Sequence, residues 1–115
     1  MSDALKRQFT EALRATNMEA AELGCYSDVF EDMLSKYGGV GTALRLIKKA
    51  DIQTGLRNVC ALGRPDLSTE AMMLRPEYAT LFKESERQAA LWRLSMMGIS
   101  TEQQDLLTRS IEARV

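Results

Sequence analysis

The stretch LKRQFTEALRATNMEAAELG, residues 5–24, decides the fold class of this chain. Apolar or small side chains recur in it every three or four residues, and charged side chains fall between them. This stripe comprises Leu5, Phe9, Ala12, Leu13, Thr16, Ala20 and Leu23. Such spacing matches the turn of an α-helix and not the two-residue alternation of a strand. It predicts an amphipathic helix that is capped by Ser2 or Asp3 and ends at Gly24.

The same spacing continues along the rest of the chain. It predicts further helices over residues 27–37, 42–50, 53–62, 68–74, 76–82, 85–97 and 100–114. Start and stop signals stand at these boundaries: Ser27, Gly38, Gly39, Gly63, Ser68, Pro76 and Gly98. Ser85 followed by Gln88 has the spacing of a capping box at a helix start. We therefore predict an all-α fold, a compact bundle of seven or eight short helices with no sheet.

The length and composition fit one domain. With 115 residues and 45% hydrophobic side chains, the chain has the size and apolar content of a single packed core. We treat residues 1–115 as one helical domain, in which residues 1–24 and 100–115 are candidate helical arms. No apolar run reaches the length of about 18 residues that a membrane span needs, and the N-terminus lacks the pattern of a secretion signal. These features predict a cytoplasmic protein.

The residues that most enzymes use are scarce in this sequence. Histidine is absent, which removes the commonest general base and the commonest metal ligand. Cys25 and Cys60 are the only cysteines, and no histidine can activate either as a nucleophile. Neighbouring carboxylates such as Glu84 and Glu86 lack the contrasting environments that separate an acid from a base. We expect no enzymatic activity, no catalytic residues, no metal and no cofactor, and no small-molecule substrate is evident.

Charge is unevenly distributed, although the formal net charge is -1. Residues 1–34 carry three basic and seven acidic side chains, whereas residues 35–65 carry six basic and one acidic. Arg45, Lys48 and Lys49 are three and four residues apart and therefore share one helical face. This face could attract phosphates or an acidic protein surface, or it could pair with the acidic first helix within the fold.

Residues 42–62 resemble the helix-turn-helix of small DNA-binding regulators, with apolar positions that fit two packed helices. The resemblance implies a nucleic-acid-binding regulator that uses the basic segment 42–64. Its phosphate or base contacts would be Arg45, Lys48, Lys49 and Arg57. The same apolar spacing is shared by any two packed helices, so a purely structural helix pair stays open as the other interpretation.

The block Leu62–Ser68 is the most specific local feature of the sequence. Gly63 can end a helix, Pro65 prevents its continuation, and Asp66 or Ser68 can cap the next one. The block therefore predicts a structural corner in which Arg64 and Asp66 pair across the turn. A contact of Arg64 with a partner is the alternative.

A second resemblance covers residues 37–94. The residues that carry it are Tyr37-Gly38-Gly39, Gly41-Thr42-Ala43, the block Gly63–Ser68 with Glu70, and Leu81-Phe82 followed by Glu84 and Glu86. Together they look like a helical module of uncharacterised bacterial proteins. The resemblance implies a bacterial or phage origin and a recurring helical unit. It assigns no activity and no site.

The predicted helix over residues 85–97 carries apolar side chains on two sides. The two stripes are Ala90, Leu91 and Leu94, and Ala89, Trp92 and Met96. A helix of this kind is either central to the bundle or offers a face to a partner. Methionine and tryptophan are frequent at adaptable interfaces. We therefore predict a non-catalytic adaptor, inhibitor or regulator that binds a protein partner or self-associates, with Trp92, Met96 and Arg64 as candidate partner-binding residues.

Overall fold

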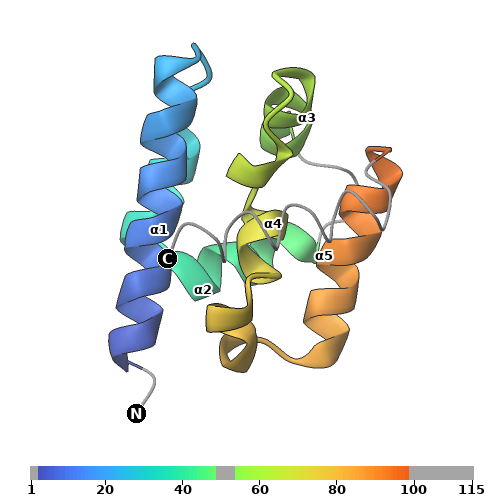
Figure 1. Ribbon diagram of the computed structural model, residues 1–115. Coiled ribbons are helices and arrows are strands. Elements are labelled where there is room, and N and C mark those ends of the chain that lie inside the picture. The colour runs from blue at the N-terminus through green and yellow to red at the C-terminus, as the bar shows by residue number, and fades with distance from the viewer. Residues whose placement is uncertain (1–2, 49–53, 99–115) are drawn as a thin grey trace.

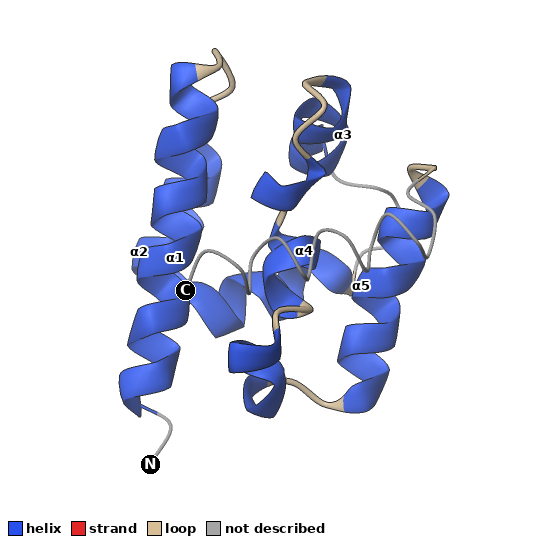
Figure 2. Cartoon of the chain, in the orientation of Figure 1, coloured by secondary structure: helices blue, strands red, loops and turns tan. Residues whose placement is uncertain are grey.

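The computed structural model describes residues 3–48 and 54–98, and this part of the chain consists of helices joined by short loops, with no strand (Figure 2). Its α-helices are α1 (Asp3–Glu22), α2 (Asp28–Ile47), α3 (Thr54–Ala61), α4 (Thr69–Met73) and α5 (Glu84–Met96). Its two 3₁₀ helices are η1 (Pro65–Leu67) and η2 (Pro76–Leu81). The predicted all-α class is confirmed, and the fold is compact. The count of seven or eight helices stays a prediction, because the helix expected over residues 100–114 lies outside the described residues.

The short helix α4 lies at the centre of the fold, between α1 and α5 (Figure 1). All five of its residues are buried. The main core gathers around it and contains Phe9, Leu13, Leu34, Ala43, Met72, Met73, Tyr78, Phe82 and Ala90. Phe9 of α1 packs edge-on against Tyr78 and Phe82, with ring centroids 5.0 and 5.3 Å away. Because Phe9 and Leu13 are fully buried, the N-terminal helix, considered above as an arm, contributes directly to the core.

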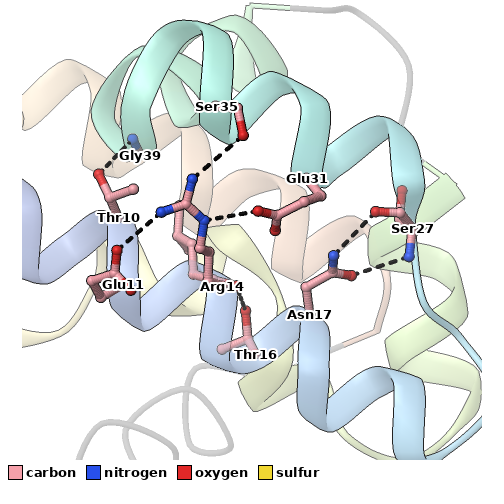
Figure 3. Close-up of polar contacts among 10 residues, drawn as sticks. Thr10, Glu11, Arg14, Thr16, Asn17, Ser27, Glu31, Ser35 and Gly39 are labelled. Atoms are coloured by element: carbon pink, nitrogen blue, oxygen red, sulfur yellow. Dashed lines mark hydrogen bonds and ion pairs between the residues drawn. The ribbon is translucent and has the colours of Figure 1, made fainter.

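Polar side chains join α1 to α2 (Figure 3). Gly38 has φ 74° and ψ 174°, and this non-helical backbone breaks α2 into two halves. The first amide after the break, that of Gly39, donates to the Thr10 hydroxyl of α1 at 2.8 Å. At the start of α2, the Asn17 side chain accepts from the Ser27 amide and donates to the Ser27 carbonyl, both at 3.1 Å. Side chains of α1 therefore hold both the start of α2 and its break.

Most of the predicted helix ends are confirmed. Gly24, Gly63 and Gly98 have φ values of 87°, 74° and 83° directly after α1, α3 and α5, which is the left-handed conformation that commonly ends a helix. The Ser68 hydroxyl accepts from the Ala71 amide at 3.1 Å and so caps α4. In each case the signal acts on backbone groups only a few residues away.

Two predicted helix starts are wrong. The helix predicted to begin at Thr42 instead resumes directly after Gly38, because α1 supplies the cap that the local sequence lacks. The capping box predicted at Ser85 is shifted along the chain. The Glu86 carboxylate accepts from the Lys83 amide at 2.7 Å, so the helix starts before Ser85. An acidic side chain at the third helical position favours this register over the one at Ser85.

Thr42 is fully buried in α2, and its hydroxyl makes no hydrogen bond in the described part of the chain. Such a hydroxyl often donates to the carbonyl four residues back, but that residue is Gly38, whose backbone is not helical. A buried polar group without a partner costs about 1–3 kcal/mol, so we expect Thr42→Val to raise the free energy of unfolding by about 1 kcal/mol. Urea denaturation measures the change. Thr42→Ala removes a methyl group as well and should be about 1 kcal/mol less stable than Thr42→Val. A loss of stability in Thr42→Val would contradict the absence of a hydrogen bond.

Candidate interaction surface

Helix α5 places its two apolar stripes on different sides of the helix. Ala90 and Leu94 are buried against the core, whereas the Trp92 and Met96 side chains are 52% and 58% exposed. The sequence left open whether both stripes are buried in the bundle or one of them is exposed to a partner. For the stripe that contains Trp92, a position inside the bundle is wrong. A tryptophan exposed to this degree leaves much of a large apolar ring in water.

The positions nearest to Trp92 along α5 carry no charged side chain, although one of them, Gln88, donates to the Glu84 carboxylate at 2.9 Å. The residues three and four positions away from Trp92 on α5 are Gln88, Ala89, Ser95 and Met96, and Ser85 continues the row towards the helix start. We call these six residues the α5 face, since such positions are neighbours on one side of a helix. In a chain with 27% charged residues, an uncharged row with tryptophan at its centre has the composition of an interface core. Charged residues are depleted there, and aromatic residues and methionine are enriched.

The rotation of α5 is set by a buried ion pair. Arg93 follows Trp92 in the sequence but is 1% exposed, and its Nε donates to Glu70 Oε2 of α4 at 3.2 Å. Glu70 is 2% exposed, and burial raises its pKa, an effect that the nearby Arg93 charge opposes. Successive residues are about 100° apart around a helix, so an inward Arg93 turns its neighbour Trp92 away from the core.

Arg64 ties the corner after α3 to α1. It donates to both carboxylate oxygens of Asp66, at 3.1 and 3.0 Å, and it also contacts the Glu19 carboxylate on α1. The predicted pair of Arg64 and Asp66 is thus confirmed. A hollow of about 220 Å³ lies beside this corner and is lined by Ala12, Ala15, Thr16, Glu19, Asp66, Leu67, Met72 and Arg75. Because two carboxylates engage its guanidinium, Arg64 acts first as a structural tie, and its contact with a partner stays a prediction.

The residues predicted to contact nucleic acid are distributed over two helices. Arg45 and Lys48 are exposed at the end of α2, Arg57 is exposed on α3, and Lys49 lies outside the described residues. Arg45 lies over the ring of Tyr37, with its guanidinium carbon 3.8 Å from the ring centroid. The structure therefore brings Arg45 and Lys48 to the same end of α2. The predicted turn of the helix-turn-helix lies outside the described residues.

The two cysteines, Cys25 and Cys60, are unpaired thiols that are partly buried. Burial and, to a smaller extent, the Glu70 charge raise the pKa of Cys60, which disfavours the reactive thiolate. Within residues 3–48 and 54–98, no group of three or more cysteine or acidic side chains is placed to hold a metal ion. A search of the same part for a helix long and apolar enough to cross a membrane found none.

Pattern analysis missed a second group of exposed apolar side chains. Met18, Leu23, Tyr26 and Val29 are exposed at the junction of α1 and α2. The predicted apolar stripe of the first helix includes Leu23, and this assignment to a buried side is wrong because Leu23 lies just beyond the end of α1. Val29, in the first turn of α2, is 70% exposed. Helical spacing alone does not reveal where a helix extends past the core. The junction of α1 and α2 is a second exposed apolar surface, on which a control variant for the α5 face can be made.

Comparison of the chain with models of protein families, with curated proteins and with solved structures found no match. The fold and the surface therefore define the protein only by class. It is an all-α domain with an uncharged helix face centred on Trp92 and a separate basic region at the end of α2. The resemblance of residues 37–94 to a bacterial helical module stays an expectation.

Proposed function

We propose that this protein is a non-catalytic adaptor, inhibitor or regulator that acts by binding another protein through the α5 face. The observation that carries the proposal is the half-exposed Trp92 side chain at the centre of an uncharged helix surface. Burial of apolar surface contributes roughly 25 cal/mol for each Å² removed from water. Covering the indole ring of Trp92 and the thioether of Met96 would therefore favour association.

The chemistry of the α5 face indicates what the partner offers. The positions around Trp92 carry no charge, so the matching surface is an apolar cleft and not a charged patch. Tryptophan is among the residues that most often dominate binding energy, and methionine adapts to irregular apolar surfaces. Ser85, at the edge of the face, can hydrogen-bond with a polar rim.

Fluorescence tests this proposal directly, because Trp92 is the only tryptophan of the chain. The immobilised protein captures candidate partners from an extract, and each purified candidate is then titrated against it. We expect the Trp92 emission to move to shorter wavelength and the ring to become protected from acrylamide quenching. Trp92→Ala should weaken binding by about thirtyfold or more, as for a residue that contributes at least 2 kcal/mol.

Met96→Lys is the second variant, because it places a charge in the α5 face and keeps Trp92 as the probe. It should weaken binding strongly, whereas Val29→Lys, at the exposed junction of α1 and α2, is the matched control and should leave binding unchanged. The proposal would be refuted by a partner that binds Trp92→Ala and Met96→Lys as tightly as it binds Val29→Lys. A partner that binds without altering the Trp92 emission would refute it too. A change in emission that depends only on the concentration of the chain itself would identify a second copy as the occupant.

The nucleic-acid-binding regulator is the second candidate function. The observation in its favour is that Arg45 and Lys48 are exposed and form no ion pair with a carboxylate of the described residues. Positive side chains in this state are available to phosphates, and their contribution to binding would fall steeply with salt.

A further inference from the structure

The side chains around Tyr37 on α2 form an arrangement that the α5 face does not use. The guanidinium carbon of Arg45 lies 3.8 Å from the centroid of the Tyr37 ring, and the Lys36 Nζ lies 5.2 Å from the same centroid. Two cations thus share one aromatic ring, whose π electrons attract each of them. We call these three residues the Tyr37 cluster.

Gly41 makes room for the Tyr37 cluster. Tyr37, Gly41 and Arg45 follow one another at intervals of four residues along α2. A Cβ atom at position 41 would lie only 3.0 Å from the Tyr37 Cβ, so a side chain there would crowd the base of the Tyr37 side chain. Without one, Arg45 extends back over the ring, towards the helix N-terminus, which is the direction that long side chains favour in helices.

No carboxylate of the described residues forms an ion pair with the cations of the Tyr37 cluster, although several other arginines of the chain have such a partner. Lys48 adds a further exposed cation one turn after Arg45. The Arg45 and Lys36 side chains lower the pKa of Tyr37, first as hydrogen-bond donors to its oxygen and then through their positive charges. An anion bound at this point would relieve the repulsion between the two cations.

We propose that Lys36, Tyr37 and Arg45 form a binding site for a phosphate group. A guanidinium held over a ring keeps its N–H donors at its edge, in the fork that fits two phosphate oxygens. The Lys36 ammonium adds a second charge, and the Tyr37 hydroxyl adds a hydrogen-bond donor. Because the ring already orders Arg45, binding loses less side-chain entropy than it would with a free arginine. This site is separate from the α5 face and does not depend on the proposed protein partner.

The phosphate group can belong to a small phosphomonoester or to the backbone of a nucleic acid. A monoester needs only one guanidinium fork and one ammonium, which the Tyr37 cluster provides by itself. A nucleic-acid strand presents several phosphates and would engage Lys48 and Arg57 as well. The shared chemistry is the phosphate, and the experiment below separates its two sources.

Titration of the full chain with inorganic phosphate, followed by nuclear magnetic resonance, tests the site. Sodium chloride at the same ionic strength is the blank. We expect saturable shifts of the Arg45 Nε–H and the Tyr37 ring signals, and a rise in the pKa of Tyr37, because the bound anion offsets the two cations. The rings of Tyr26 and Tyr78 serve as internal references, and their signals should not shift.

Variants then locate the site. Arg45→Gln and Lys36→Gln should each weaken phosphate binding about tenfold, as expected for the loss of a charge-assisted hydrogen bond. Arg45→Lys keeps the charge and loses the fork, so most of the affinity should also be lost. Tyr37→Leu keeps both charges and removes the ring that orders them, and it should weaken binding too. Arg7→Gln and Lys83→Gln remove exposed charges elsewhere and should have no effect.

Chloride shifts equal to those with phosphate would overturn the proposal, as would equal losses in Arg7→Gln and Arg45→Gln. A short single-stranded oligonucleotide provides the second arm. If nucleic acid is the source, the oligonucleotide binds more tightly than inorganic phosphate and fails to bind once Arg45, Lys48, Lys49 and Arg57 are all changed to glutamine. If a monoester is the source, the oligonucleotide binds no more tightly than phosphate, and Lys48→Gln leaves phosphate binding unchanged. Both results support the phosphate site.

Discussion

Arg93→Met, made alone, should lower the free energy of unfolding by about 3–5 kcal/mol at neutral pH. The substitution removes the guanidinium that lies 3.2 Å from the Glu70 carboxylate, and Glu70 is 2% exposed. A charge in such surroundings is strongly unfavourable without its counter-charge. Methionine is flexible and apolar, so it can fill much of the space of the arginine stem. Urea denaturation followed by circular dichroism measures it.

The loss should depend on pH in a defined direction. Burial raises the pKa of Glu70 in the native protein and Arg93 opposes that rise, so the native pKa of Glu70 lies higher still without Arg93. A group with a raised native pKa stabilises the fold fully below its unfolded pKa of about 4.3 and loses that contribution as the pH rises through the native pKa. The stability difference between Arg93→Met and the wild type should therefore be smallest near about pH 4 and increase towards neutral pH.

Glu70→Met supplies the other half of a double-mutant cycle. A guanidinium does not release its proton in a protein, so this loss, again about 3–5 kcal/mol, should persist at low pH. The double variant replaces the pair by two apolar side chains and should be close to the wild type in stability, or above it. Arg7→Met, at an exposed position, is the surface control and should change stability by no more than about 0.5 kcal/mol. Strictly additive single effects would contradict the coupling of Glu70 and Arg93.

Trp92 and Arg93 show how far the sequence predicts the α5 face. The spacing of apolar residues revealed two stripes on one helix, but it did not decide which of them faces the core. Hydrophobicity alone favours burying Trp92 and exposing Arg93, because charged side chains are rarely buried without a partner. The partner is Glu70, 23 residues earlier, and nothing in its local sequence marks it as buried. The orientation of α5 therefore depends on a tertiary contact that a local pattern does not contain.

In α2, too, the features that depend on local sequence were predicted, and those that depend on tertiary contacts were not. Gly38 was recognised as a break because glycine acts on its own backbone. The immediate restart of the helix depends on Thr10, 29 residues away, and was missed. The Tyr37 cluster was missed for a related reason. Lys36 and Arg45 lie on opposite sides of the break, so their convergence on one ring depends on the direction of both halves.

Gly39→Ala should lower the free energy of unfolding by about 2–3 kcal/mol, as measured by urea denaturation. A Cβ atom on Gly39 would lie 2.8 Å from the Thr10 Cα and 2.9 Å from the Thr10 amide nitrogen. Both are backbone atoms in the middle of α1, so no side-chain rotation relieves the contact, and the two helices have to move apart. Alanine is intrinsically better than glycine in a helix by about 1 kcal/mol, and the expected loss arises in spite of that gain.

Gly41→Ala is the matched control, since it makes the same change two residues later in the same half of α2. Among the described residues its Cβ would meet only the Tyr37 Cβ, at 3.0 Å, and we expect stability to change by less than about 1 kcal/mol. Separation of the helices in Gly39→Ala would also weaken the 2.8 Å hydrogen bond from the Gly39 amide to the Thr10 hydroxyl. Hydrogen exchange of the backbone amides at the start of the second half of α2, directly after Gly38, should then accelerate in Gly39→Ala and not in Gly41→Ala. Unchanged stability in Gly39→Ala would contradict the close crossing of α1 and α2 at Thr10.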